Sequence, residues 1–308
     1  MDKKEVYLSA SRIKTLETCS WSYYCKYHLN IPEKSNSGAK RGTICHLVFE
    51  LLLNPRHKEL YEEIIASGDP LSCAPVGRLV IKHATREGIN NLEDIALINK
   101  MILVGLKSDF FPKGGDIQNP EFEFKIERDG YKARGFIDLP ILYKEEKKSK
   151  IRDYKSSKAK FKGEELTANV QAMLYSIASK IYWPEYEPEV EFIFLRFPKA
   201  PVQPVKFTDD ELSGFEVYLK HVYGKVSNFS EQDAKQNFAA DDVKSRWLCQ
   251  AGATWVCPFK NEMWFYSIYD KNDKFVKSFF TAEEAKAAKK DDSQVIKKFK
   301  YEGCPRWK

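Results

Sequence analysis

The residues best suited to chemistry lie within positions 132–162, where Asp138, Asp153 and Lys155 belong to two short apolar runs. Read as two strands of a hairpin, these runs bring two carboxylates and an ammonium together. Because side chains alternate along a strand, Asp153 and Lys155 face one side and Tyr154 faces the other. Carboxylate oxygens bind Mg²⁺, and a lysine orients water or offsets charge on a phosphate. The group is therefore suited to phosphodiester hydrolysis.

The same stretch also has a simpler interpretation. The tripeptide D-x-K is common and on its own fits a hairpin whose polar face is merely solvated. Residues 144–162 carry nine Lys or Arg against three acids, a net charge of +6. Basic charge beside a site suits a polyanionic substrate, but a lysine-rich turn in solvent has the same composition.

Length and composition indicate a folded, soluble chain. Its 308 residues are 43% hydrophobic and 31% charged, enough for one elaborated domain or two. No apolar run is long enough to cross a bilayer, and the first residues lack a signal-peptide core. We therefore expect a cytoplasmic protein that does not bind membranes.

Three more side chains could join the site. His46 lies near the expected start of an apolar helix, one turn after Gly42, and could be a neutral imidazole ligand or a packed core residue. Gln171 and Tyr175 share one face of a predicted helix, where they could contact nucleic acid or pack on a sheet. Residues 121–127 alternate as a strand, and one of its acids could approach the metal.

Four motifs in this order resemble the RecB-type branch of the PD-(D/E)XK nucleases, which includes nuclease domains of bacterial recombination helicase-nucleases, CRISPR-adaptation exonucleases and many phage exonucleases. The motifs are G-x-x-x-H at 42–46, G-x-I-D at 135–138, D-x-K at 153–155 and Q-x-x-x-Y at 171–175. Each is weak alone, but together they outweigh the simpler interpretations. The resemblance covers about residues 8 to 200.

The resemblance implies an α/β fold with a restriction-endonuclease-like core, a mixed central sheet flanked by helices. We expect a nuclease domain over residues 1–260, with a helical insertion at about 56–119. Residues 261–308 would form a small C-terminal extension that guides DNA, binds a partner or closes the core.

The resemblance also assigns roles. His46, Asp138 and Asp153 would bind Mg²⁺ or Mn²⁺, with the Tyr154 carbonyl as a further ligand, and Lys155 would be the catalytic lysine. Gln171 and Tyr175 would support the site and contact DNA.

The implied activity is metal-dependent DNA cleavage, by an exonuclease rather than an endonuclease. It would act on ends or single strands in recombination, repair or phage DNA processing, with a protein partner from a recombination or replication complex. A phage-encoded protein would work in the host cytoplasm. The alternative is a catalytically silent, nuclease-like DNA-binding or scaffolding subunit.

Many members of this branch carry an iron–sulfur cluster on four cysteines, one near the N-terminus and three near the C-terminus. Cys19 fits the first position and Cys257-Pro258 resembles the second half, but Thr254 and Met263 occupy the other two. Thiolates of Cys19, Cys249, Cys257 and Cys304 could still hold a cluster or zinc. The spacing favours seven reduced, ordinarily packed cysteines instead, so we expect no cluster.

Overall fold

The computed structural model describes residues 5–250 and 257–307. Its contacts divide the chain into two units. The first combines the N-terminal ten residues with Ser35–Tyr223, and the second combines Ser11–Lys34 with Gly224–Lys308. Thr254, which occupies one of the cysteine positions expected for a cluster, lies outside the described residues. The predicted domains, residues 1–260 and 261–308, stay a prediction.

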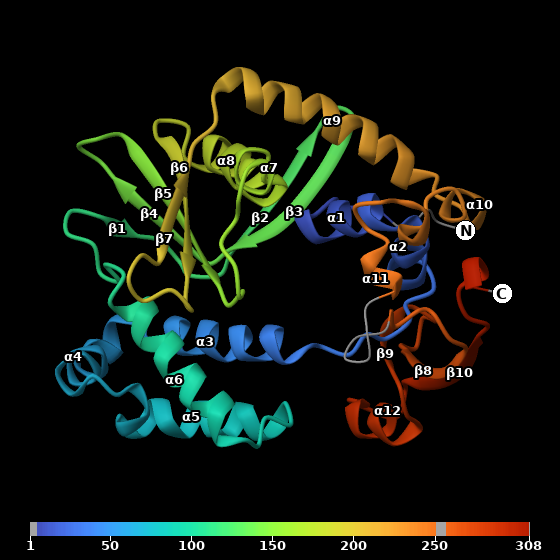
Figure 1. The fold of residues 1–308 in the computed structure, drawn as a ribbon, viewed down its shortest axis with the longest axis horizontal. Helices are drawn as coiled ribbons and strands as arrows, with labels where there is room; N and C mark the ends of the chain where they lie inside the picture. The colour runs from blue at the N-terminus through green and yellow to red at the C-terminus, as the bar shows by residue number, and fades with distance from the viewer. Residues whose placement is uncertain (1–4, 251–256, 308) are drawn as a thin grey trace. The chain divides into compact units, whose positions relative to one another are not determined.

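The first unit is built on a five-stranded mixed sheet in the order β1-β4-β5-β6-β7 (Figure 1). The pairing of β5 with β6 is parallel, and the other three pairings are antiparallel. A separate antiparallel ribbon is formed by β2 and β3. The predicted mixed sheet is therefore confirmed. The strands are β1 Asp116–Ile117, β2 Phe122–Arg128, β3 Tyr131–Ile137, β4 Leu139–Tyr143, β5 Lys148–Lys155, β6 Glu187–Phe194 and β7 Val202–Val205.

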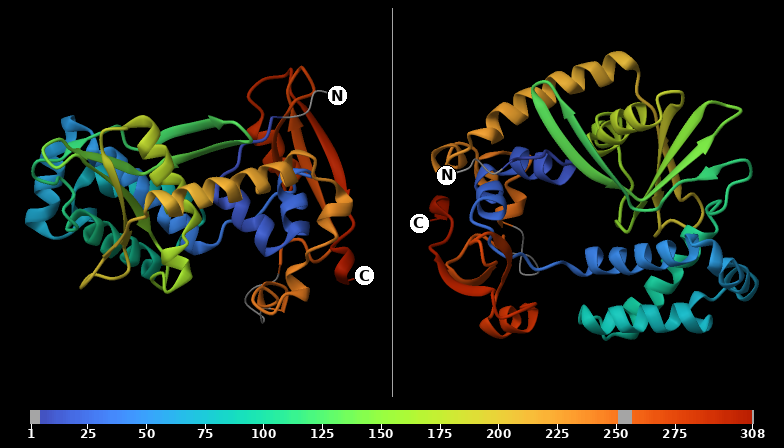
Figure 2. Two further views of the ribbon diagram at one scale, coloured as in Figure 1. Left: turned by 90° about the horizontal axis from the view of Figure 1, so that it is seen from above. Right: turned by 180° about the vertical axis from the view of Figure 1, so that it is seen from behind.

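One face of this sheet is covered by four helices (Figure 2). Their apolar sides form one buried core with strand residues that include Ile141, Tyr154 and Ile193. Asn36 and Asn91 cap two of the helices by accepting hydrogen bonds from backbone N–H groups. The predicted helical character of residues 56–119 is thus seen over most of that segment. The helices are α3 Ser37–Leu53, α4 Lys58–Ser67, α5 Ala74–Arg86 and α6 Leu92–Leu106.

The opposite face packs against α8, Val170–Tyr182, which follows the short α7, Glu164–Thr167. Asn169 caps α8, and its buried residues are spaced so that one side lies on β5 and β6. The Ser179 and Ser149 hydroxyls hydrogen-bond across this contact at 2.6 Å. Because β5 has helices on both faces, its side chains are mostly buried. The helix α9 follows at Asp209–Ser227.

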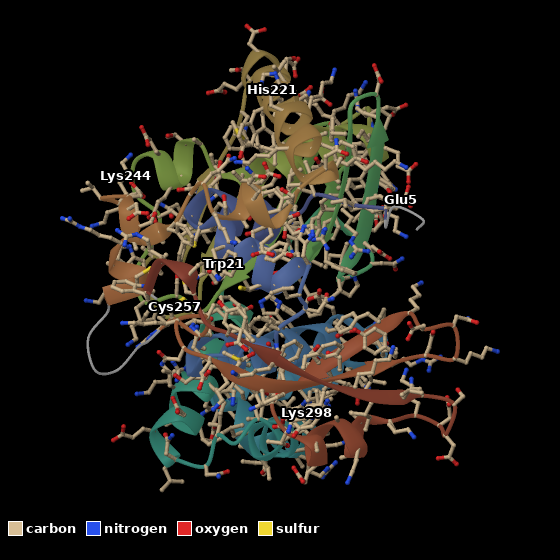
Figure 3. All side chains as sticks on the ribbon, turned by 90° about the vertical axis from the view of Figure 1, so that its right-hand side faces the viewer. Glu5, Trp21, His221, Lys244, Cys257 and Lys298 are labelled. Atoms are coloured by element: carbon tan, nitrogen blue, oxygen red, sulfur yellow. The ribbon has the colours of Figure 1, made fainter. Side chains whose placement is uncertain are left out.

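The second unit contains a second sheet, formed by residues of the expected C-terminal extension. Strand β8 (Met263–Tyr269) pairs with β9 (Phe275–Phe279) and with β10 (Val295–Tyr301) in the order β10-β8-β9, and α12 is Ala282–Ala288. Trp21, seen in Figure 3, donates a 2.7 Å hydrogen bond to the Tyr301 hydroxyl. The remaining helices of the unit are α1 Ala10–Thr18, α2 Ser20–Tyr27, α10 Glu231–Ala234 and α11 Trp247–Gln250.

Within the described residues, every helix is too short or too polar to cross a lipid bilayer.

Candidate metal and catalytic site

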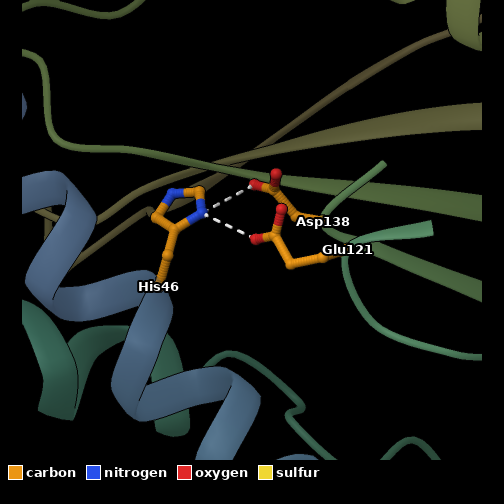
Figure 4. A group of neighbouring side chains, drawn as sticks. All are labelled: His46, Glu121 and Asp138. Carbon is orange, nitrogen blue, oxygen red and sulfur yellow. Dashed lines mark hydrogen bonds and ion pairs between the residues drawn. The ribbon is translucent and has the colours of Figure 1, made fainter. Parts of the chain in front are cut away.

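Three side chains of the first unit converge as a metal site would require. His46, Glu121 and Asp138 each offer a ligand atom, and these atoms all lie within 4.8 Å of one another. His46 Nδ1 is 3.4 Å from Glu121 Oε1 and 3.6 Å from Asp138 Oδ2 (Figure 4). One imidazole nitrogen and two carboxylates form a donor set that suits a divalent cation.

Glu121 was not among the predicted ligands, although its strand was expected to bring an acid near the metal. The antiparallel register of β2 and β3 pairs Phe122 with Ile137, which leaves Glu121 opposite Asp138. The Glu121 N–H donates a 3.0 Å hydrogen bond to the Asp138 carbonyl, and the Glu121 backbone has a φ of 51°. A positive φ is costly for a residue other than glycine, so the surrounding contacts must hold this conformation.

His46 lies in the middle of its helix, because α3 begins at Ser37. The expectation that it opens the helix is therefore wrong; the Asn36 cap sets the start much earlier. Gly42, one turn before His46, explains the spacing of the motif. A Cβ on Gly42 would lie 2.8 Å from the Ser156 Oγ, so glycine lets α3 approach the end of β5.

Asp153 and Lys155 point to the same face of β5, opposite to Tyr154, as predicted. Lys155 Nζ lies 2.6 Å from Asp153 Oδ2 in an ion pair. Oδ2 is buried and makes this ion pair without a further hydrogen-bond partner among the described residues. The Lys155 ammonium therefore offsets the cost of burying this carboxylate oxygen.

Gln171 and Tyr175 project from α8 onto this pair. Gln171 Oε1 accepts a 2.7 Å hydrogen bond from Lys155, and its Nε2 donates to Asp153 Oδ1 at 2.9 Å. Nε2 also donates to the Tyr175 hydroxyl at 2.6 Å. That hydroxyl lies 2.7 Å from the Phe136 carbonyl oxygen and 3.2 Å from Asp153 Oδ1. The predicted supporting residues thus contact the predicted catalytic ones directly.

The Tyr154 carbonyl oxygen, predicted to be a metal ligand, lies 3.1 Å from His46 Nε2. If Nε2 carries the proton, Nδ1 is left to face the two carboxylates and a cation. The Tyr154 N–H donates to Asp138 Oδ2 at 2.7 Å. Tyr154 therefore positions both His46 and Asp138, and its role as a ligand stays a prediction.

The electrostatics of the site favour added positive charge. Burial lowers the pKa of His46, but its hydrogen bond to Glu121 and the charge of Asp138 outweigh burial and raise the pKa to about 9. Burial and the nearby Asp153 charge raise the pKa of Asp138 to about 7. Neighbouring carboxylates raise the pKa values of both His46 and Asp138. A divalent cation would relieve the same crowding, so the residues present fit one.

These groups line one open pocket of about 710 Å³. Its walls include all three members of the His46 group together with Asp153, Lys155 and Gln171. Tyr175 is buried behind them. All four motifs therefore place a side chain in one pocket, and the fourth also supplies Tyr175 behind it.

The four candidate cluster ligands lie close together in the second unit, where Cys257 can be found in Figure 3. Burial raises the pKa of Cys257 to about 11, and the thiols of Cys249, Cys19 and Cys304 add to this effect. Burial also raises the pKa values of Cys249 and Cys304, again with a contribution from Cys19. All four thiols are thus within electrostatic reach of one another, a proximity that their spacing in the sequence did not indicate.

This arrangement does not form a ready zinc site. Four thiolates at Zn–S distances of 2.3 Å would lie about 3.8 Å apart. Among the described residues, no three cysteines bring their sulfur atoms within 4.8 Å of one another.

Comparisons with known proteins agree with the fold. A family model described as the PD-(D/E)XK nuclease superfamily matches residues 7–261. No curated protein matches the chain. A crystal structure described as a "Putative exonuclease" from Eubacterium rectale is similar with a TM-score of 0.49 and 12% identity, covering 78% of this chain and 87% of that one.

Proposed function

Because the chain belongs to the PD-(D/E)XK nuclease superfamily, we propose that it is a divalent-metal-dependent deoxyribonuclease, and more specifically an exonuclease. The observation that carries the proposal is the convergence of His46, Glu121 and Asp138 beside the Asp153–Lys155 pair. Oxygen-rich donors favour Mg²⁺ or Mn²⁺ over softer metals.

His46, Glu121, Asp138 and Asp153 would hold the cation, with Asp153 Oδ2, which pairs with Lys155, as an oxygen donor. When bound, it would supply Lewis-acid activation of water and neutralise charge on the scissile phosphate. Gln171 holds Lys155 in place, so the ammonium can donate to the attacking water or to a phosphate oxygen as charge develops there. Water adds to phosphorus, the bond to one sugar oxygen breaks, and a phosphate monoester and a hydroxyl end result.

The choice of DNA and of an exonuclease rests on the resemblance to the RecB-type branch. Two cations of the basic run, Lys155 and Lys158, line pockets at the site, which supports a polyanionic substrate. We further propose that the enzyme acts on ends or single strands during recombination, repair or phage DNA processing, alongside a protein partner.

The test is cleavage of 5′-labelled, 3′-labelled and closed circular DNA with Mg²⁺, with Mn²⁺ and with EDTA. We expect wild-type protein to degrade linear DNA with either metal and to lose activity in EDTA. Asp153→Ala and Lys155→Ala should be inactive, while the exposed-site controls Asp129→Ala and Lys162→Ala should match wild type. Equal activity of wild type and both site variants would remove the assignment. DNA binding without cleavage would instead support the silent-subunit alternative.

A further inference from the structure

A second pocket adjoins the metal pocket at the end of β5. It has a volume of about 530 Å³ and lies between the start of α3 and residues 155–158. Ala39, Tyr154, Lys155 and Ser156 line both pockets. A ligand that spans the two would therefore pass directly over the catalytic lysine.

The two pockets differ in charge. The metal pocket is lined by four acids, Glu50, Glu121, Asp138 and Asp153. The second pocket has no carboxylate in its lining and contains four cationic side chains, Arg41, Lys155, Lys158 and Arg196. An acidic pocket that suits a cation thus lies beside a basic pocket that suits an anion.

Two of those cations are not engaged by acids. Arg41 pairs with Asp94, and Lys155 pairs with Asp153. No acid of residues 5–250 or 257–307 forms an ion pair with Lys158 or Arg196.

Arg196 also has an unused donor. Its Nη1 is buried and has no hydrogen-bond partner in the part of the chain that the structure describes. A buried guanidinium N–H without an acceptor is costly, and an anionic oxygen would remove that cost. Ser37 and Gly38, in the first turn of the 17-residue helix α3, line the same pocket. The positive end of the helix dipole adds to the attraction for an anion.

We propose that this pocket binds a second phosphate group of the DNA strand, next to the phosphodiester that is cleaved, and that Arg196 and Lys158 hold it. The guanidinium fork matches two phosphate oxygens, and the lysine supplies a point charge. The ligand is either a terminal phosphate monoester or an internal phosphodiester, which share this chemistry. The inference rests on the proposed function, because it assigns part of the same substrate.

The test measures binding of fluorescent single-stranded oligonucleotides in EDTA over a series of salt concentrations, for Arg196→Met, Lys158→Met and the double variant. The matched control is Lys162→Met, an exposed lysine of the same basic run that does not line the pocket. We expect Arg196→Met to bind roughly tenfold more weakly. Its slope of log K against log salt should be shallower by about 0.7. Lys162→Met should resemble wild type.

Oligonucleotides with a 5′-phosphate, a 3′-phosphate or two hydroxyl ends, and a closed single-stranded circle, distinguish the two sources. A loss confined to one phosphorylated end identifies a terminal phosphate, and an equal loss on the circle identifies an internal one. Equal binding by Arg196→Met, the double variant and Lys162→Met would overturn the inference. Should Arg196→Met unfold, Lys158→Met carries the test, because Lys158 is exposed.

Cleavage by wild-type protein is recorded in parallel. Active wild type with unchanged binding in the pocket variants would remove this inference and leave the proposed function. Inactive wild type would remove the proposed function while the binding comparison still decides the phosphate pocket.

Discussion

Gln171 anchors Lys155, the proposed catalytic lysine: its Oε1 accepts a 2.7 Å hydrogen bond from the Lys155 ammonium. The same side chain donates to Asp153 and to Tyr175 through Nε2. One amide therefore fixes the positions of a cation and an anion that must both face the substrate. Gln171 acts through these neighbours, so we regard it as a positioning residue.

Replacing Gln171 with Met should lower the rate of cleavage without abolishing metal binding. Loss of a hydrogen bond to a charged group costs about 1.5–3 kcal/mol, or roughly 10- to 150-fold in rate. Gln171→Glu keeps an acceptor for Lys155 but adds a negative charge beside Asp153, so it should also weaken DNA binding. Single-turnover cleavage measures the rate, and Mn²⁺ titration measures metal binding. Gln232→Met, at an exposed position, is the control.

An unchanged rate in Gln171→Met would show that Lys155 does not depend on this amide. A rate loss matched by an equal loss of Mn²⁺ affinity would instead indicate a general disturbance of the site.

Glu121 should contribute to metal binding, whereas Glu123 should not. The two acids are two residues apart, but Glu123 is exposed and lies 3.9 Å from Lys125. Mn²⁺ at 100 times its Kd should stabilise wild-type protein by about 2.7 kcal/mol. We expect this gain, measured by thermal unfolding with Mn²⁺ and with EDTA, to be much smaller in Glu121→Gln and unchanged in Glu123→Gln. A full gain in Glu121→Gln would exclude it as a ligand.

The antiparallel ribbon shows both what the sequence could predict and what was missed. The motif order pointed to Asp138, which lies beside His46 and Glu121, but its strand was expected to pair with residues 151–155. In the structure β3 pairs with β2, and β4 pairs with β5. Asp129-Gly130 is the turn between β2 and β3, and Gly130 has a φ of 87°. Counting outward from an Asp-Gly turn pairs Glu121 with Asp138, so this signal could have revealed the third ligand.

Other features depend on contacts that no local pattern contains. The alternation of β5 was enough to separate Asp153 and Lys155 from Tyr154. The closeness of His46 to Tyr154, however, depends on packing between α3 and the sheet. The gathering of four cysteines likewise depends on tertiary structure, because Cys249 and Cys304 do not follow the family spacing.

Gly42→Ala should reduce activity by moving α3 away from β5. The added Cβ would meet Ser156 Oγ at 2.8 Å and Ser156 Cβ at 3.3 Å, so either Ser156 or the helix carrying His46 must give way. We expect roughly a tenfold loss of activity, since small displacements of a site are costly. Gly214→Ala is the control, because nothing lies near a Cβ there. Equal activity of the two variants would show that the close approach is not needed.

The sheet that supports Asp153 should be stabilised by Glu189 in a pH-dependent way. Burial opposes ionisation of Glu189, but Lys206 and Lys148, each 3.0 Å away, outweigh burial and lower its pKa. A lowered pKa stabilises the fold above the unfolded value, about 4.3, and this stability is lost as the pH falls through the folded value. Glu189→Gln should cost about 1 kcal/mol in urea unfolding at pH 7 and almost nothing at pH 3. An equal cost at both values would contradict this ion-pair role.

The neighbouring thiols of the second unit give a prediction that opposes the one from spacing. Cys19, Cys249, Cys257 and Cys304 act on one another's pKa values, so a cluster held by them would give anaerobically purified protein iron, sulfide and visible absorbance. Cys257→Ser should lose the iron, whereas Cys73→Ser should keep it, because Cys73 lies in the first unit. Colourless wild-type protein without iron would restore the original expectation of ordinary packing.

The most direct test of the central claim is the position of Mn²⁺ in a crystal of the wild-type protein, located by anomalous scattering. The proposed site predicts a peak coordinated by His46 Nδ1, Glu121 and Asp138, beside Asp153, which disappears from crystals of Asp138→Asn. Mn²⁺ bound elsewhere while this pocket remains empty, or a peak that persists unchanged in Asp138→Asn, would contradict it.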